Sequence, residues 1–223
     1  MSSINTSFSE EINFIHLSDT HLPDREDYVA WDVSPMQTAR ITIDQMTELT
    51  GVDFCVHTGD VCDVDGIGNR ASYRLADQLF GAVKMPKYFV AGNHDSPEIM
   101  HDYLDFGQRE HVLEHKNKTC YQFNKNGLAF FVLDARQGRQ SVGYVDREQQ
   151  DWLLERFLAL SSDQKVVVFM HYPLFNQTVP WIQQKMLVKN AGEVHSVFKK
   201  FSNQLLAVFH GHIHSGLDRK SVV

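Results

Sequence analysis

Five short apolar stretches of this chain are each followed at once by aspartate, asparagine or histidine residues. Their composition predicts buried β-strands, which cover Ile12–Leu17, Val52–His57, Tyr88–Val90, Val166–Met170 and Leu205–Phe209. The polar residues after them are, in the same order, Asp19 and His21, Asp60 and Asp63, Asn93 with His94 and Asp95, His171, and His212 with His214. Because ligands of α/β proteins collect at the carboxyl ends of strands, these side chains can meet at one rim.

Helical patterns and one hairpin lie between these stretches. The apolar spacings predict helices around Met36–Met46, Tyr73–Phe80, Glu148–Leu160 and Val194–Phe201. Two further strands, Tyr121–Phe123 and Leu128–Leu133, flank Asn126-Gly127, which is a strong hairpin signal. Alternating strands and helices predict α/β layers, and the hairpin predicts a mixed sheet. We expect residues 1–10 to form a loose tail and residues 11–223 to form a single domain.

Composition excludes several classes of protein. The formal net charge is -7 and no basic stripe is present, so we expect no polymeric nucleic acid as a partner. The cysteines are three in number and scattered, which suggests neither a disulfide framework nor a thiolate zinc site. No apolar run approaches the roughly 20 residues of a membrane span. A cytoplasmic location is the default expectation, without a membrane partner.

The residue types after the strands indicate metal chemistry. Carboxylates and imidazoles together suit borderline metals such as iron, manganese or zinc. Two cations about 4 Å apart, joined by an anionic oxygen, can clamp both the attacking and the leaving oxygen of a phosphoryl transfer. The other histidines are assigned to the surface or the core, namely His16, His57, His101, His111, His115, His195 and His210.

The ordered series Asp-x-His, Gly-Asp-x-x-Asp, Gly-Asn-His-Asp, His and Gly-His-x-His resembles that of the calcineurin-like metallophosphoesterases, from Asp19 to His214. The resemblance implies a four-layer α/β/β/α sandwich with two mixed β-sheets. In that family the chain runs on past the last motif into further strands, whereas this chain stops nine residues later, at Val223. Either the chain is truncated or the second sheet is smaller and lacks its C-terminal strands.

The resemblance also implies two metal ions, of iron, manganese or zinc, and a role for each motif residue. One ion would take Asp19, His21, Asp60 and His214; the other would take Asp60, Asn93, His171 and His212. Asp60 would bridge them.

In the family a metal-bound hydroxide attacks phosphorus. His94 would then protonate the departing alkoxide, a step that a positioned acid typically accelerates by about 10²–10⁴-fold. Asp95 would orient His94, and Asp63 would lie just behind the ligands. For both carboxylates the alternative is a role in capping a turn.

A narrower resemblance suggests the substrate. The opening Leu-Ser-Asp-Thr-His-Leu at 17–22, Leu-Asp-Ala at 133–135 and Gln-x-x-Trp-Leu at 149–153 are similar to the bacterial class III cyclic-nucleotide phosphodiesterases. Those enzymes open 3′,5′-cyclic AMP to the 5′-monophosphate. Glycerophosphodiester hydrolases share much of the pattern, and a general phosphomonoesterase or a non-catalytic metal-binding interaction protein remain further alternatives. Substrate contacts are predicted from Asn93, His94, Trp181 and Asn190, the last two within the 173–191 segment.

Overall fold

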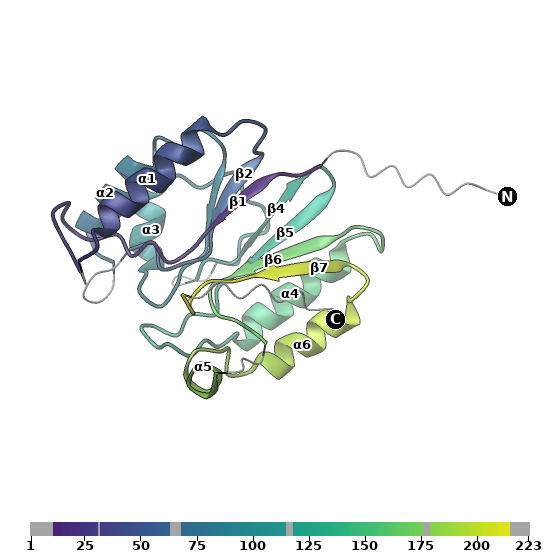
Figure 1. Ribbon diagram of the computed structural model, residues 1–223. Coiled ribbons are helices and arrows are strands. Elements are labelled where there is room, and N and C mark those ends of the chain that lie inside the picture. The colour runs from purple at the N-terminus through teal and green to yellow at the C-terminus, as the bar shows by residue number, and fades with distance from the viewer. Residues whose placement is uncertain (1–10, 31, 63–67, 115–117, 176–178, 215–223) are drawn as a thin grey trace.

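The computed structural model describes residues 11–30, 32–62, 68–114, 118–175 and 179–214, and its regular elements form two β-sheets flanked by helices (Figure 1). The strands are β1 (Phe14–Leu17), β2 (Phe54–His57), β3 (Lys87–Phe89), β4 (Tyr121–Lys125), β5 (Leu128–Leu133), β6 (Val166–Met170) and β7 (Leu205–Phe209). The helices are α1 (Pro35–Glu48), α2 (Arg70–Phe80), α3 (Pro97–Tyr103), α4 (Arg147–Ala159), α5 (Pro180–Lys185) and α6 (Ala191–Lys200).

The elements stack in four layers. Helices α1, α2 and α3 cover the outer face of the β1-β2-β3 sheet, and α4 and α6 cover the outer face of the β4-β5-β6-β7 sheet (Figure 1). The inner faces of the two sheets pack on each other through an aromatic cluster that includes Phe54, Tyr88, Phe123, Phe130 and Phe169. The predicted α/β/β/α sandwich is confirmed.

Strand pairing differs from the prediction in one sheet. The second sheet is mixed, since β4 and β5 form an antiparallel hairpin while β5, β6 and β7 run parallel. The first sheet was also expected to be mixed, but β1, β2 and β3 pair only in parallel within the described residues. Each of these strands is joined to the next through a helix, so each crossover returns the chain in the same direction.

Burial of both sheet faces explains why the strands are apolar throughout. On β5, Phe130 and Val132 face the cluster between the sheets, whereas Phe131 and Leu133 face the cluster beneath α4 and α6. Successive side chains of a strand point to opposite faces, and both faces are covered here. This burial produces the uninterrupted apolar stretches that mark the strands in the sequence.

Local signals set the helix ends. In α1, Ser34 caps the first turn by accepting a hydrogen bond from the Gln37 N–H, and Pro35 occupies the first helical position. Capping boxes begin α2 at Asn69 and α4 at Asp146.

No helix within the described parts of the chain is long and apolar enough to cross a membrane.

Phe130→Ala tests the packing between the sheets. The Phe130 ring is fully buried and stacks on Phe123 with 4.7 Å between ring centroids. We expect its removal to lower the free energy of unfolding by about 3–5 kcal/mol. Urea unfolding with metal chelated measures this loss, and Leu158→Ala, at a side chain that is 67% exposed, is the control. Equal losses in the two variants would contradict the assigned core.

Candidate metal centre

The carboxyl ends of β1, β2, β3, β6 and β7 bring the predicted ligands together. The loops after β1 and β2 continue the parallel pairing of their strands, with the Asp19 N–H donating to Gly59 O and the His21 N–H donating to Asp60 O, both at 3.0 Å. The loop after β7 is fixed to the end of β6, where the Gly211 N–H donates to His171 O at 3.0 Å. Backbone hydrogen bonds therefore set the spacing of the loops that carry the ligands.

Asp60 lies at the centre of the site and is 1% exposed. Its Oδ1 accepts a hydrogen bond from the His94 backbone N–H at 2.9 Å. Its Oδ2 lies 3.2 Å from His171 Nε2 and 3.8 Å from His21 Nε2. One carboxylate oxygen thus faces imidazole nitrogens from two different strand ends, which is the position expected of a bridging ligand.

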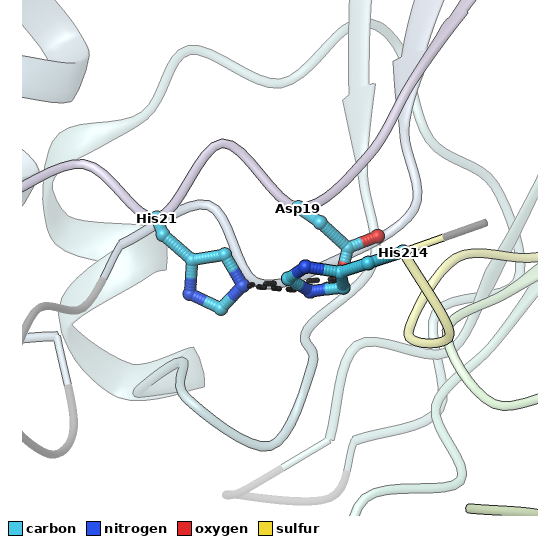
Figure 2. Close-up of side chains that lie close together, drawn as sticks. All are labelled: Asp19, His21 and His214. Carbon is cyan, nitrogen blue, oxygen red and sulfur yellow. Dashed lines mark hydrogen bonds and ion pairs between the residues drawn. The ribbon is translucent and has the colours of Figure 1, made fainter. Parts of the chain in front are cut away.

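A first group of ligand atoms comes from Asp19, His21 and His214, whose side chains point toward one another (Figure 2). Asp19 Oδ1 lies 3.2 Å from His214 Nε2 and 4.0 Å from His21 Nε2. The two imidazole Nε2 atoms are 3.2 Å apart. An oxygen and two nitrogens at such distances fit one cation of the borderline class.

A second group comes from Asp60, His171 and His212, all of them buried. Asn93 joins this group, since its Oδ1 lies 3.3 Å from His171 Nε2. The structure thus brings the predicted ligands together in two groups, and Asp60 also lies within reach of His21 of the first. Their binding of two metal ions stays a prediction.

Hydrogen bonds leave one ring nitrogen of each buried histidine facing the site. The His171 Nδ1–H donates to Thr58 O at 2.8 Å, which turns Nε2 toward Asp60. The His212 Nε2–H donates to Ser141 O at 2.8 Å, which leaves Nδ1 for a ligand bond. A backbone acceptor behind a histidine ligand fixes its tautomer and orientation in metal sites.

The pKa shifts follow from burial and from the two carboxylates. Burial alone would lower the pKa of His171, but the neighbouring Asp60 carboxylate raises it to about 9. Burial and the charge of His171 lower the pKa of His212 to about 4. Burial opposes ionisation of Asp19, yet the hydrogen bond from His214 holds the pKa of that carboxyl well below its usual range. Positive charge is therefore stabilised on His171, beside Asp60, and is disfavoured on the neighbouring His212.

Backbone strain is concentrated at the same residues. Asp19, His21, Asp60, His212 and His214 all have positive φ, and they make up five of the eight such non-glycine residues within the described ranges. Left-handed backbone costs about 1–3 kcal/mol per non-glycine residue and clusters at functional sites. The sandwich holds these residues in strained turns that aim their side chains at one point.

His94 lies beside the first group. Its ring centroid is 5.0 Å from that of His21, and a ring nitrogen shares a group of close ligand atoms with His21 and Asp60. His94 thus lies beside the predicted metal ligands, where it can act either as the acid or as a further metal ligand.

Asp95 lies among backbone N–H groups, as the turn-capping alternative predicts. Its buried carboxylate accepts hydrogen bonds from the backbone N–H groups of Val61, Cys62 and Gly92 and from the Tyr73 hydroxyl. These bonds join the Asp60 loop to the Gly92 loop, so Asp95 acts as a positioning residue. The orientation of His94 by Asp95 stays a prediction.

The sequence did not predict the polar contacts of two residues that support the site. The Tyr73 hydroxyl, which donates to Asp95 at 2.9 Å, also accepts from the Ser96 N–H at 3.0 Å. His57 is buried as expected, but its ring links the Gly59 N–H to the Thr20 hydroxyl beneath the metal loops. Their helix and strand patterns mark both residues only as core, and nothing in the sequence reveals the polar contacts.

The remaining predicted site residues have different outcomes. Asp63 lies outside the described residues. The Asn190 amide donates to Val145 O and to Glu193 and accepts from the Val145 N–H, so it has a structural role, and its substrate contact stays a prediction. Trp181, on α5, is 61% exposed and is not a core anchor.

The match of the chain to known families agrees with this geometry. Residues 12–216 match the model of the calcineurin-like phosphoesterase family. The chain belongs to this family. It is therefore a hydrolase of phosphoric esters from a divalent-metal-dependent family, and the donor groups described above fit that requirement.

Relatives of this phosphoesterase include two kinds of phosphodiesterase. A protein of Fibrobacter succinogenes named as a probable cyclic nucleotide phosphodiesterase is 26% identical over 199 residues, which are 89% of this chain and 71% of the relative. A probable glycerophosphodiester phosphodiesterase of Arcobacter nitrofigilis is 24% identical over 163 residues, or 73% of this chain and 56% of that protein. Purple acid phosphatase of yellow lupin shares the fold, with a TM-score of 0.62, 14% identity, and coverage of 93% of this chain and 38% of that one.

Gly92→Ala tests whether the phosphoesterase needs close backbone approach at Asp60. A Cβ at position 92 would lie 2.5 Å from the Asp60 backbone nitrogen and would also collide with the Asp60 carboxylate. We expect the displaced carboxylate to reduce bound metal to less than half of the wild-type content, measured by elemental analysis.

Gly192→Ala is the matched control. A Cβ at position 192, within α6, meets nothing within 4 Å, so metal content should not change. Full metal content in the Gly92→Ala protein would contradict the inferred crowding around Asp60.

Proposed function

We propose that this chain is a two-metal phosphodiesterase that opens 3′,5′-cyclic nucleotides, with cyclic AMP as the favoured substrate. The observation that carries the proposal is the pair of ligand groups joined at the buried Asp60 carboxylate. Asp19, His21 and His214 would hold one metal ion. Asn93, His171 and His212 would hold the other. When bound, such ions activate water and stabilise charge on the phosphoryl oxygens.

The protein's own groups would then position the substrate and move one proton. Asn93 and His94 follow β3, and the His94 backbone is held on Asp60 by a 2.9 Å hydrogen bond. His94, as the acid, would give its ring proton to the 3′ oxygen as the bond from that oxygen to phosphorus breaks. An alkoxide is a poor leaving group, so this transfer lowers the barrier.

Two further observations support a nucleotide substrate. The Fibrobacter succinogenes protein that is named as a probable cyclic nucleotide phosphodiesterase aligns with 89% of the chain. The end of the 173–191 segment pairs with the chain just after the predicted ligand His171, because the Val188 N–H donates to Pro173 O. The same end also pairs with Gly143 through Leu187 and Lys189. Trp181, exposed on the same segment, offers a face on which a base can stack.

Leaving-group dependence tests His94. His94→Ala should keep both metals yet lose about 10²–10⁴-fold in kcat with an alkyl phosphodiester, because the leaving alkoxide then departs without a proton. A nitrophenyl phosphodiester, whose leaving group hardly needs protonation, should lose much less. Elemental analysis accompanies the kinetics. Loss of a metal, or equal losses with both substrates, would assign His94 to metal binding.

A substrate panel tests the nucleotide preference. Among cyclic AMP, a glycerophosphodiester and a phosphomonoester, assayed with manganese, we expect the highest kcat/KM with cyclic AMP. Trp181→Ala should lower that value by roughly 5- to 100-fold, the range expected for loss of one base–aromatic contact, and Trp181→Phe should restore most of it. Turnover of a small aryl phosphodiester should stay unchanged. A higher kcat/KM with the glycerophosphodiester would instead favour glycerophosphodiester hydrolysis as the function.

A further inference from the structure

A cavity of about 380 Å³ lies directly beyond the His94 loop. One wall is formed by residues 95–98, and the opposite wall by Lys118, Arg136 and Gly138. Two cationic side chains thus line a small cavity in a protein whose formal net charge is -7. Asp95 and Glu98 line the same cavity, so its charged side chains are two of each sign.

The Lys118 ammonium is fixed by two backbone carbonyls. It donates hydrogen bonds to the carbonyl oxygens of Asp134 and Arg136, which leaves one of its three N–H groups available. Within the described parts of the chain, no carboxylate lies at ion-pair distance from it. The buried Asp95 carboxylate, which also lines the cavity, is held by four hydrogen bonds from groups other than Lys118. Glu98 is the acidic side chain on the exposed edge of the cavity.

The cationic wall is tied to the loop that carries the predicted metal ligand and acid. Thr119, next to Lys118, accepts a hydrogen bond from the Ala91 N–H at 2.8 Å. The Asp134 carboxylate accepts from the Thr119 N–H at 2.9 Å and from the Arg136 N–H at 2.8 Å. Lys118 and Arg136 therefore hold defined positions relative to residues 91–94.

The loop that supplies Arg136 also reaches the second ligand group. Four residues beyond Arg136, Gln140 O accepts from the Tyr172 hydroxyl at 2.8 Å, and Ser141 O accepts from His212. The cavity is thus flanked on one side by the His94 loop and on the other by the loop behind His212. Both of its walls therefore continue into loops that carry or contact predicted metal ligands.

We propose that this cavity is a subsite for a second anionic group of the substrate, a phosphate or a carboxylate. This inference rests on the proposed phosphodiesterase function and extends it, because a cyclic nucleotide carries one phosphate and cannot fill both places. The additional substrates would be linear phosphodiesters with a terminal phosphate. In their hydrolysis a water oxygen bonds to the diester phosphorus, the bond to the leaving alcohol breaks, that alcohol oxygen takes a proton, and the terminal phosphate is unchanged.

Two dinucleotides that differ by one phosphate test the subsite. Adenylyl-(3′→5′)-adenosine has no terminal phosphate, and its 5′-phosphorylated form has one. With the manganese-loaded protein at fixed ionic strength, the added phosphate should raise kcat/KM by about ten-fold or more, as expected for one charge-assisted hydrogen bond. Chromatography of the products separates diester cleavage from release of the terminal phosphate.

Lys118→Met, which removes the charge and keeps most of the stem, should abolish the ten-fold gain and leave the unphosphorylated dinucleotide and cyclic AMP within about two-fold. Arg136→Gln should act in the same direction. Lys165→Met is the matched control, because Lys165 also donates to a backbone carbonyl, that of Asn203 at 2.6 Å, and should change nothing.

Three results would overturn the subsite. They are a gain that survives Lys118→Met, equal losses with both dinucleotides, and no cleavage of either dinucleotide while cyclic AMP is hydrolysed. Failure to cleave any of the three compounds would instead refute the proposed function itself, and the two failures are therefore distinguishable.

Discussion

Asp60 is almost fully buried, and its two carboxylate oxygens face groups from the ends of β1, β3 and β6. A buried carboxylate is stable only where hydrogen bonds and positive charge replace water. Here a backbone N–H and two imidazoles supply part of that stabilisation, and divalent cations would supply the rest. This requirement ties the metal chemistry of the site to the stability of the loops around it.

The remainder of the fold keeps those loops in place. Parallel pairing sends β1, β2 and β3 to one edge, and the aromatic packing between the sheets sets that edge against the ends of β6 and β7. Hydrogen bonds to Asp95 and Thr119 then join neighbouring loops. Such fixed layers can hold five predicted ligand residues at positive φ. The conformational free energy of these left-handed residues is more than an isolated loop could sustain.

The sequence predicted most of the fold because both faces of each central strand are buried, as the apolar runs Leu128–Leu133 and Val166–Met170 show. It predicted that the candidate ligands would lie close together because each motif directly follows such a run. It did not reveal that the amide of Asn190 is used within the protein or that Asp95 bonds to another loop. Those contacts depend on which loops become neighbours in space, and a side chain's partner is not encoded in its own motif. The purely parallel first sheet was missed for a related reason, since pairing direction depends on the crossovers.

Metal stoichiometry tests the central claim most directly, because bridging makes both ions depend on one carboxylate. Manganese-loaded protein should contain two ions per chain by elemental analysis. Asp60→Ala should lose both, whereas Asn93→Ala, which removes a ligand of one group only, should mainly weaken one. Two tightly held ions in the Asp60→Ala protein, or a single ion in the wild type, would contradict a centre built around Asp60.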